Sequence, residues 1–381
     1  MSATVPFHHI AFNRQARTSR ELDYVREALV SHTSGDGPFG KRAEKLLETS
    51  LGCKRALLTT SCTHALEMSA LLLDIGPDDE VIVPSFTFVS TANAFALRGA
   101  RIVFADIRPD TLNLDETRLE ALVGPRTKAI VPVHYGGVGC EMDAICAIAA
   151  RGSAKVVEDN AHGLFGQWKG RPLGTFGSLA TQSFHETKNF SCGEGGALLL
   201  NDPELAERAE ILREKGTNRS RFFRGEVDKY TWVDLGSSYV LSDLLAAMLL
   251  AQLEERREIQ ARRQRIWDRY AREIETWAQR VSATLPTIPS HVEQTFHLFY
   301  VLMPDLARRT AFLAHLNARG VKAIFHYVPL HLSPMGMKQG GKAGDCPVTE
   351  SVSERLVRLP LFADMSESEI AHVIESVISF D

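Results

Sequence analysis

The sequence has no long uninterrupted hydrophobic run. Its two most apolar stretches, residues 81–97 and 239–253, are each broken by polar residues, and neither supplies the ~20 apolar residues that a membrane span needs. The start of the chain has neither the basic segment nor the apolar core of a secretory signal peptide. We therefore expect a soluble, cytoplasmic protein with no membrane partner.

The sequence also has no excess of charge of either sign. Its 381 residues include 43 Lys and Arg against 47 Asp and Glu, a formal net charge of −4. A dedicated nucleic-acid-binding protein needs a clear basic excess, so no nucleic-acid partner is expected. Hydrophobic residues make up 44% of the chain, which allows a sizeable core and excludes intrinsic disorder.

Cysteine is sparse and follows no motif. The six cysteines lie far apart with no CxxC pair, so the sequence predicts buried or incidental thiols in a reducing compartment and no metal site. Internal repeats of the period found in solenoid proteins are also absent.

Short apolar runs alternate with helical stretches between residues 55 and 200. Helices are predicted over residues 63–73 and 87–97. The runs predicted as strands are residues 55–59, 80–84, 101–106, 128–134, 154–159, 180–184 and 196–200. Continuous Val, Ile and Leu strands separated by helices indicate an α/β fold whose largely parallel sheet is covered on both faces. In such sheets ligands bind at the carboxyl ends of the strands.

The pattern changes after about residue 242. Residues 243–280 predict one long helix, whose second half mixes Arg with Glu and is expected to be a solvated face with mixed-sign pairs. The remaining strands and helices predict a smaller C-terminal α+β domain. We predict a large domain over residues 1–242, and the linking helix with the small domain over residues 243–381.

Three predicted strand ends or helix starts are polar. Asp159 ends one predicted strand and His162 comes shortly after it, Lys188 follows another strand, and residues 61–64 open a helix. Each feature alone has an ordinary explanation, because such residues are often helix caps or solvated side chains.

Together these residues fit the chemistry of pyridoxal phosphate (PLP). This cofactor needs a lysine that bonds to its aldehyde and a carboxylate beside its pyridine nitrogen. Its phosphate needs hydroxyls and backbone amides at a helix N-terminus, and its ring needs a flat side chain against one face. Lys188 and Asp159 are the candidates for the lysine and the carboxylate. Residues 61–64 with Ser183 are the candidates for the phosphate site, and Phe88 or His162 for the flat side chain.

The chain resembles the DegT/DnrJ/EryC1/StrS family of sugar aminotransferases from about residue 12 to its end. The motifs that carry the resemblance are residues 34–39, 79–88, 131–137, 157–163, 183–189, 193–196 and 325–331. The resemblance implies the aspartate aminotransferase (type I PLP) fold. It also implies a PLP cofactor and a homodimer with shared active sites.

The resemblance also implies roles for individual residues. Lys188 would bond to the cofactor and move protons, and Asp159 would pair with the pyridine nitrogen. Thr63, His64 and Ser183 would bind the phosphate, and Phe88 and His162 would contact the ring. His185, close to Lys188 in the sequence, would support the lysine. Many members complete the phosphate site with an Asn of the neighbouring subunit. This chain has Ser238 at that position, so either Ser238 takes the role or the contact is missing.

Residues 90–100, 213–220 and 228–232 resemble the members that make dTDP-4-amino-4,6-dideoxy-D-galactose. This implies transfer of the amino group of L-glutamate to the 4-keto carbon of dTDP-4-keto-6-deoxy-D-glucose. The alternatives are a sugar 3-aminotransferase, a 3-dehydratase or a non-catalytic PLP-binding regulatory protein. The 3-dehydratases carry His at the lysine position, whereas this chain has Lys188.

Substrate contacts are predicted in two places. Residues 213–229 hold six basic against three acidic side chains, so Arg219 is a candidate for the diphosphate, with a solvated loop as the alternative. His326, Tyr327 and His331 are candidates for the sugar, with ordinary strand packing as the alternative.

Overall fold

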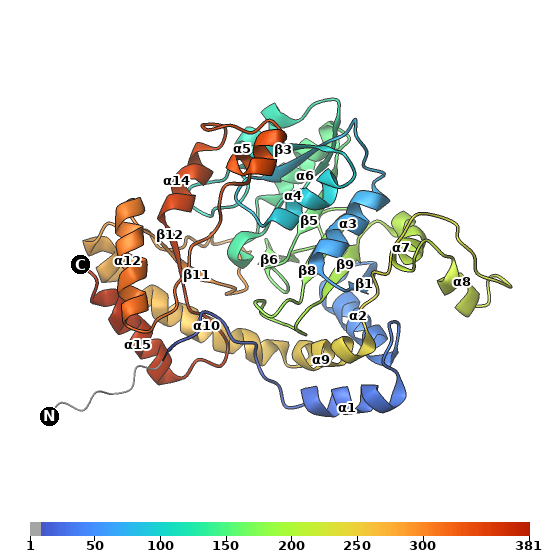
Figure 1. The fold of residues 1–381 in the computed structure, drawn as a ribbon, viewed down its shortest axis with the longest axis horizontal. Helices are drawn as coiled ribbons and strands as arrows, with labels where there is room; N and C mark the ends of the chain where they lie inside the picture. Colours follow the sequence, from blue (N-terminus) through green and yellow to red (C-terminus); the bar gives the residue numbers. More distant parts are fainter. Residues whose placement is uncertain (1–8) are drawn as a thin grey trace.

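A seven-stranded sheet forms the centre of the molecule (Figure 1). The structure is a computed structural model that describes residues 9–381. Within these residues the strand order is β1-β9-β8-β5-β4-β2-β3. The bounds are Arg55–Thr59 (β1), Glu80–Pro84 (β2), Arg101–Ala105 (β3), Thr127–Ile130 (β4), Lys155–Asp159 (β5), Leu179–Ser183 (β8) and Gly196–Leu200 (β9).

The sheet is mostly parallel, as the sequence predicts. Strands β3, β2, β4, β5 and β8 run in one direction, while β9 is antiparallel to both of its neighbours. The run predicted over residues 128–134 is shorter than expected. Pro132 has no N–H for a strand ladder, and the chain turns into a short helix over Tyr135–Gly137, where Gly136 has φ 65°.

Helices cover both faces of the sheet because its side chains alternate between two hydrophobic clusters. On β1, Ala56 and Leu58 pack with the cluster of α1, α2 and α9, whereas Leu57 packs with the cluster of α3, α4 and α7. The helices of this part are α1 (Glu21–Ser31), α2 (Pro38–Leu51), α3 (Cys62–Leu72), α4 (Val89–Ala96), α5 (Glu116–Leu119), α6 (Met142–Arg151), α7 (Ala206–Arg213) and α8 (Arg219–Phe223).

The long helix predicted over residues 243–280 is instead three helices, α9 (Asp243–Glu254), α10 (Arg256–Glu273) and α11 (Glu275–Arg280). The backbone leaves helical geometry at Glu255 and Ile274. These breaks let α9 pack on α1 and α2 while α10 packs on the C-terminal elements. The expected solvated face with mixed-sign pairs is present, because Arg262 pairs with Glu258 and Arg269 pairs with Glu273. Another face of α10 buries Ile266, Trp267 and Tyr270.

The C-terminal part has its own hydrophobic cluster. A two-stranded antiparallel sheet of β11 (Phe299–Leu302) and β12 (Leu356–Leu359) is packed by α10, α12 (Leu306–Ala318), α14 (Pro347–Arg355) and α15 (Glu367–Ile378). The remaining elements are α13 (Pro334–Lys338) and a small sheet of β6 (Gln167–Trp168), β7 (Arg171–Pro172) and β10 (Val292–Glu293). The domain division at residue 242 stays a prediction. Among residues 9–381, no helix is long and apolar enough to cross a membrane.

Candidate active site

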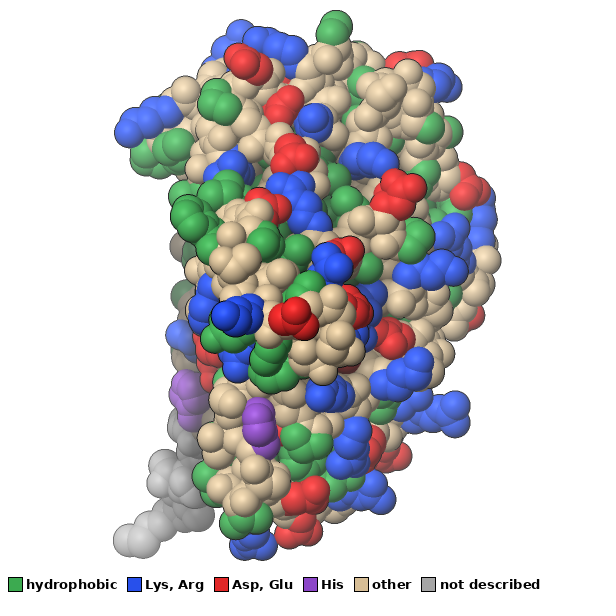
Figure 2. Space-filling view, turned by 90° about the vertical axis from the view of Figure 1, so that its right-hand side faces the viewer, with side chains coloured by type: hydrophobic (Ala, Val, Ile, Leu, Met, Phe, Trp, Pro, Cys, Tyr) green, Lys and Arg blue, Asp and Glu red, His purple; other side chains and the backbone are tan. Residues whose placement is uncertain are grey.

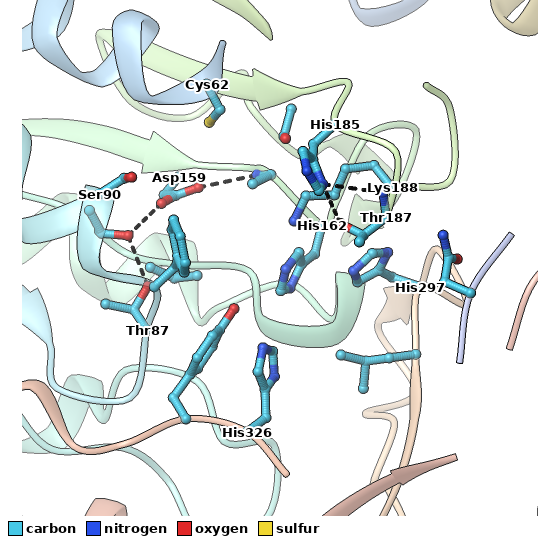
Figure 3. A pocket seen from close by; sticks show the side chains of 18 of the residues that line it. Cys62, Thr87, Ser90, Asp159, His162, His185, Thr187, Lys188, His297 and His326 are labelled. Carbon is cyan, nitrogen blue, oxygen red and sulfur yellow. Dashed lines mark hydrogen bonds between the residues drawn. The ribbon is translucent and has the colours of Figure 1, made fainter. Parts of the chain in front are cut away.

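A cavity of about 770 Å³ lies where the sheet meets the C-terminal part. Its walls come from the ends of β5 and β8, the first turns of α3 and α4, and strand β12 with the loop of residues 324–328. Residues near both ends of the chain, such as Phe12 and Leu361, also line it. The predicted residues that line this cavity are Thr63, Phe88, Asp159, His162, Ser183, His185, Lys188, His326 and Tyr327. Figure 3 labels Asp159, His162, His185, Lys188 and His326 among them.

Lys188 lies in the loop that connects β8 with β9. The loop turns tightly, because Lys188 N–H donates to the carbonyl of His185 (2.9 Å) and Glu186 N–H donates to that of Gly193 (2.9 Å). Burial lowers the pKa of Lys188 to about 8. A larger share of its amine is therefore unprotonated near neutral pH than for an exposed lysine, as a nucleophile requires.

Asp159 is the last residue of β5 and presents a buried carboxylate to the cavity. One oxygen accepts a hydrogen bond from Thr91 Oγ1 (2.7 Å), and the other accepts one from the N–H of Ala161 (3.2 Å) (Figure 3). Burial raises the pKa of this carboxyl group, and the hydrogen bond from Thr91 opposes the rise. A carboxylate held in this way suits a protonated ring nitrogen.

The N-terminus of α3 faces the same cavity. Ser61 caps this helix, because its Oγ accepts the N–H of His64 (3.1 Å), and Thr63 Oγ1 bonds to Ser90 Oγ (2.8 Å). The amides at the start of a helix and its dipole bind phosphate. Gly196 allows the close approach of β9 to this turn, because a Cβ there would lie 2.3 Å from the carbonyl carbon of Ser61.

Three histidines stack along one wall. The ring centroids of His162 and His297 are 4.2 Å apart with 25° between the planes, and those of His162 and His326 are 6.4 Å apart with 22°. Burial lowers the pKa of each well below its ordinary value, so the wall is neutral. His297 also bonds to Asn189 Oδ1 through Nδ1 (2.9 Å), beside Lys188.

Two further residues of the site, His297 and Arg358, were not predicted from the sequence. Both come from the C-terminal part and line the cavity. The available signal was an arginine inside an otherwise apolar strand, since β12 reads Leu-Val-Arg-Leu. Without the fold, this pattern does not indicate which side of the strand faces a ligand.

Three other predicted residues do not line the cavity within the described chain. The ring of His64 bonds to Thr60 Oγ1 through Nδ1 (2.5 Å). His331 is fully buried and bonds to Ser85 Oγ (2.6 Å) and Glu350 Oε1 (3.0 Å). Both of its ring nitrogens are therefore occupied, which corrects the prediction that it contacts the sugar. Arg219 lies 3.7 Å from Glu214 and over the ring of Phe223.

Ser238 is exposed and also lies outside the cavity of its own chain. It follows a segment, residues 219–235, that projects from the molecule around α8 (Figure 1). The face seen in Figure 2, on the side where this segment projects, mixes hydrophobic side chains with basic and acidic ones. The role that the resemblance implies for Ser238, in the site of a neighbouring subunit, stays a prediction.

The donor set of this cavity fits PLP. A buried amine, a buried carboxylate, a helix N-terminus and flat rings converge there from separate elements. This combination defines the class of the protein as a PLP-dependent enzyme.

The chain belongs to the DegT/DnrJ/EryC1/StrS aminotransferase family, whose model matches residues 15–378. It is 36% identical over 380 residues to the spore coat polysaccharide biosynthesis protein SpsC of Bacillus subtilis, covering 97% of this chain and 96% of that protein.

Two solved structures are similar over nearly their whole length. The aminotransferase TlmJ from Streptoalloteichus hindustanus superposes with a TM-score of 0.89 at 34% identity, covering 97% of this chain and 98% of that one. A protein of Streptococcus pneumoniae assigned as a sugar aminotransferase, in its PLP form, superposes with a TM-score of 0.91 at 26% identity, covering 98% of each chain. The predicted α/β aminotransferase fold, family and PLP cofactor are confirmed.

Proposed function

We propose that the protein transfers the amino group of L-glutamate to the 4-keto carbon of dTDP-4-keto-6-deoxy-D-glucose, giving dTDP-4-amino-4,6-dideoxy-D-galactose. The observation that carries the proposal is that the Lys188 amine and the Asp159 carboxylate line the same cavity. The choice of sugar rests on the resemblance of residues 90–100, 213–220 and 228–232. The similarity to a polysaccharide biosynthesis protein supports a sugar as acceptor.

Two residues of this chain carry the proton and charge chemistry. PLP, when bound, supplies an electron sink for charge that develops at the α-carbon of the amino donor. Lys188, with its pKa lowered to about 8, is matched to taking a proton from one carbon and delivering it to another near neutral pH. Asp159 holds a proton on the ring nitrogen, which keeps the sink strong.

The other cofactor contacts orient the ring. The amides of the first turn of α3, with Thr63, His64 and Ser183, bind the phosphate. Phe88, whose side chain is 57% exposed at the edge of the cavity, stacks on the ring from one side. Neutral His162 offers a hydrogen bond without a competing charge. His185, bonded to Thr187 Oγ1 (2.9 Å), supports the Lys188 loop, and Ser238 completes the phosphate site of a partner subunit.

The sugar lies on the side of the C-terminal part. His326 is neutral and bonds to Tyr135 Oη through Nδ1 (3.0 Å), and Tyr327 lies beside it on the same loop. Arg219 binds the diphosphate from the projecting segment. The reaction takes place in the cytoplasm, in a homodimer.

A panel of keto-sugar nucleotides tests the acceptor. The purified protein is incubated with PLP, L-glutamate and 4-keto or 3-keto sugars on dTDP or UDP, and each aminated product is identified by NMR. We expect turnover with the dTDP-linked 4-keto sugar and an axial amine at C4. Amination at C3 would replace this proposal with the 3-aminotransferase alternative, and amine loss without transfer would favour a dehydratase.

The variant Lys188→Ala tests the role of the lysine. We expect it to lose covalent attachment of PLP, seen as loss of the visible absorbance and of the mass increase after borohydride reduction. Turnover should fall by ~10³-fold or more, because the proton-transfer group is lost as well. The matched control is Lys169→Ala, which removes an exposed lysine paired with Asp143. Unchanged attachment in Lys188→Ala would contradict the assignment.

A further inference from the structure

A chain of hydrogen bonds leads from Asn189, the residue after Lys188, to His297 in the cavity wall. Asn189 Nδ2 donates to the carbonyl of Thr295 (2.7 Å) and to Gln260 Oε1 (2.9 Å). Gln260 Nε2 donates to the same carbonyl (3.0 Å). A carbonyl oxygen only accepts, so each of the two side-chain amides has a single possible orientation.

This orientation fixes the proton on the ring of His297. Asn189 Oδ1 is the amide atom that faces the ring, and it lies 2.9 Å from Nδ1 of His297. Because an amide oxygen only accepts, Nδ1 must carry a proton. Burial lowers the pKa of His297 well below its ordinary value, so the ring is neutral and its Nε2 is an acceptor. Within the described residues the ring makes no other hydrogen bond.

The ring of His162 has the opposite arrangement. Its Nδ1 accepts the N–H of Gly136 (3.3 Å), and a backbone N–H only donates. Burial also keeps this ring neutral, so its one proton is on Nε2, which donates. The rings of His162 and His297 are stacked and both line the cavity (Figure 3). The wall therefore presents a hydrogen-bond donor on one ring and an acceptor on the ring stacked against it.

We propose that Asn189 is a positioning residue that keeps His297 as an acceptor, and that His297 Nε2 accepts a hydrogen bond from the sugar hydroxyl next to the keto group. This inference rests on the proposed aminotransferase function and adds the recognition of a sugar hydroxyl to it. An ionised oxygen on the cofactor ring accepts hydrogen bonds and so suits the donor of His162, whereas His297 needs a ligand that donates. In a 4-keto-6-deoxy sugar, carbon 3 carries the only hydroxyl on a carbon beside the keto group.

The position of His297 favours the sugar over the amino donor. His297 comes from the C-terminal part, which also supplies His326 and Tyr327 to the proposed sugar side. His326 continues the row of rings on the other side of His162. After burial, the charge of Lys188 is among the causes that lower the pKa of His297 and of His326, so the row is close to the amine that moves protons. A hydroxyl beside the reacting carbon meets the same wall.

The protons on the two rings are located by NMR of the PLP-loaded protein with isotope-labelled histidine nitrogens. The signals are assigned by their loss in His297→Phe and His162→Phe. We expect the proton of His297 on Nδ1 and that of His162 on Nε2. In Asn189→Ala, His297 loses the acceptor that fixes its proton and should give the averaged signals of two tautomers, while His162 stays unchanged. A wild-type His297 with its proton on Nε2 would overturn the proposal.

Binding of an unreactive sugar tests the hydroxyl without turnover. dTDP-6-deoxy-D-glucose and its 3-deoxy analogue are titrated calorimetrically into the PLP-loaded proteins. We expect the wild type to bind the 3-deoxy analogue about 10- to 100-fold more weakly, because a buried acceptor is left unpaired. His297→Phe keeps a flat ring against His162 but has no acceptor, so it should bind the two ligands within about threefold of each other. Asn189→Ala should lie between them. The matched control is His372→Phe on α15, outside the cavity, which should behave as the wild type.

The ratio of the two affinities separates this role from a structural one. A substitution that only loosens the fold weakens the binding of both ligands and leaves the ratio of the wild type. Equal binding of the two ligands by the wild type, or an unchanged ratio in His297→Phe, would overturn the proposal. A loss in His297→Phe confined to the reaction with L-glutamate would overturn it in favour of a contact with the amino donor. If no keto sugar is aminated but the ratio still depends on His297, the proposed acceptor fails and this inference stands.

Discussion

At the scale of single residues, burial determines the charge of the groups that line the cavity. It lowers the pKa of Lys188 and of the three stacked histidines, and it raises that of Asp159. An amine that loses its proton easily becomes a nucleophile, and neutral imidazoles bind polar groups without attracting a second anion. The site thus has few formal charges, each with a separate task.

The lowered pKa of Lys188 predicts how cofactor attachment depends on pH. Only the unprotonated amine attacks the aldehyde, so the attachment rate of cofactor-free protein should rise about tenfold per pH unit below pH 8 and level off above about 8. The measurement is the growth of visible absorbance after mixing with PLP. A simple alkylamine in the same buffers is the control, and its rate should keep rising toward its own, higher pKa. If the attachment rate of the protein kept rising above pH 8, as the rate of the alkylamine does, the pKa of Lys188 would not be lowered.

The variant Asp159→Asn tests the carboxylate at the end of β5. The amide keeps a hydrogen bond to Thr91 but does not stabilise a proton on the ring nitrogen, so kcat should fall ~10²- to 10³-fold while PLP stays attached. The absorbance spectrum of the bound cofactor should change as well. Asp143→Asn, an exposed aspartate on α6, is the control and should have no effect. Equal activity of the two variants would exclude Asp159 from this role.

At the scale of elements, buried ion pairs fix helices to the sheet. Arg213 on α7 bonds to Glu44 on α2 (2.8 Å) and to Asp36, and Glu44 also accepts the N–H of Leu58 on β1 (3.0 Å). The side chains of Arg213 and Glu44 are almost fully buried. Removal of one partner leaves an uncompensated buried charge, which is more costly than loss of an exposed pair.

The variant Arg213→Met should therefore lower the free energy of unfolding by ~3–5 kcal/mol. The control is Arg221→Met, which breaks exposed pairs with Glu207 and Glu226 and should cost no more than ~1 kcal/mol. Urea unfolding followed by circular dichroism measures both. Similar losses in the two variants would show that the buried network does not hold α7 and α2.

Elements with a local signal were predictable from the sequence, whereas those that depend on distant partners were not. The apolar runs gave the strands of the sheet, and the polar residues after β5 and β8 led to Asp159 and Lys188, because both lie where parallel strands end. The reversal of β9 and the breaks at Glu255 and Ile274 depend on packing. His297 and Arg358 reach the cavity only through folding of the C-terminal part, so no local pattern assigns them to it.

At the scale of the whole molecule, the projecting segment exposes an unusual amount of apolar surface. Phe223, Tyr230 and Trp232 are 68%, 52% and 75% exposed, and exposed apolar side chains gathered on one segment are typical of an interaction site. A second copy of the chain is the partner that the proposed role of Ser238 requires. We expect this segment to be buried in the homodimer.

Replacement of two of these aromatic residues tests the dimer. Light scattering should give the mass of two chains for the wild type and of one chain for the double variant Phe223→Glu/Trp232→Glu, because buried charges without partners oppose association. Leu306→Glu on α12, an exposed apolar residue, is the control and should remain dimeric. A dimeric double variant would place the interface elsewhere.

The cavity wall that includes Phe12, Arg358 and Leu361 constrains how the protein is made. In a chain that is still emerging from the ribosome, the loop that carries Lys188 is made long before β12. Strand β1 cannot pair until β9 has emerged, and β9 follows β1 by more than a hundred residues. Such distant pairings form slowly. Before β12 emerges, a nascent chain thus presents the Lys188 amine in a pocket that is open on one side, where the burial that lowers its pKa is incomplete. Tight cofactor capture should accordingly follow the folding of β12 onto the cavity.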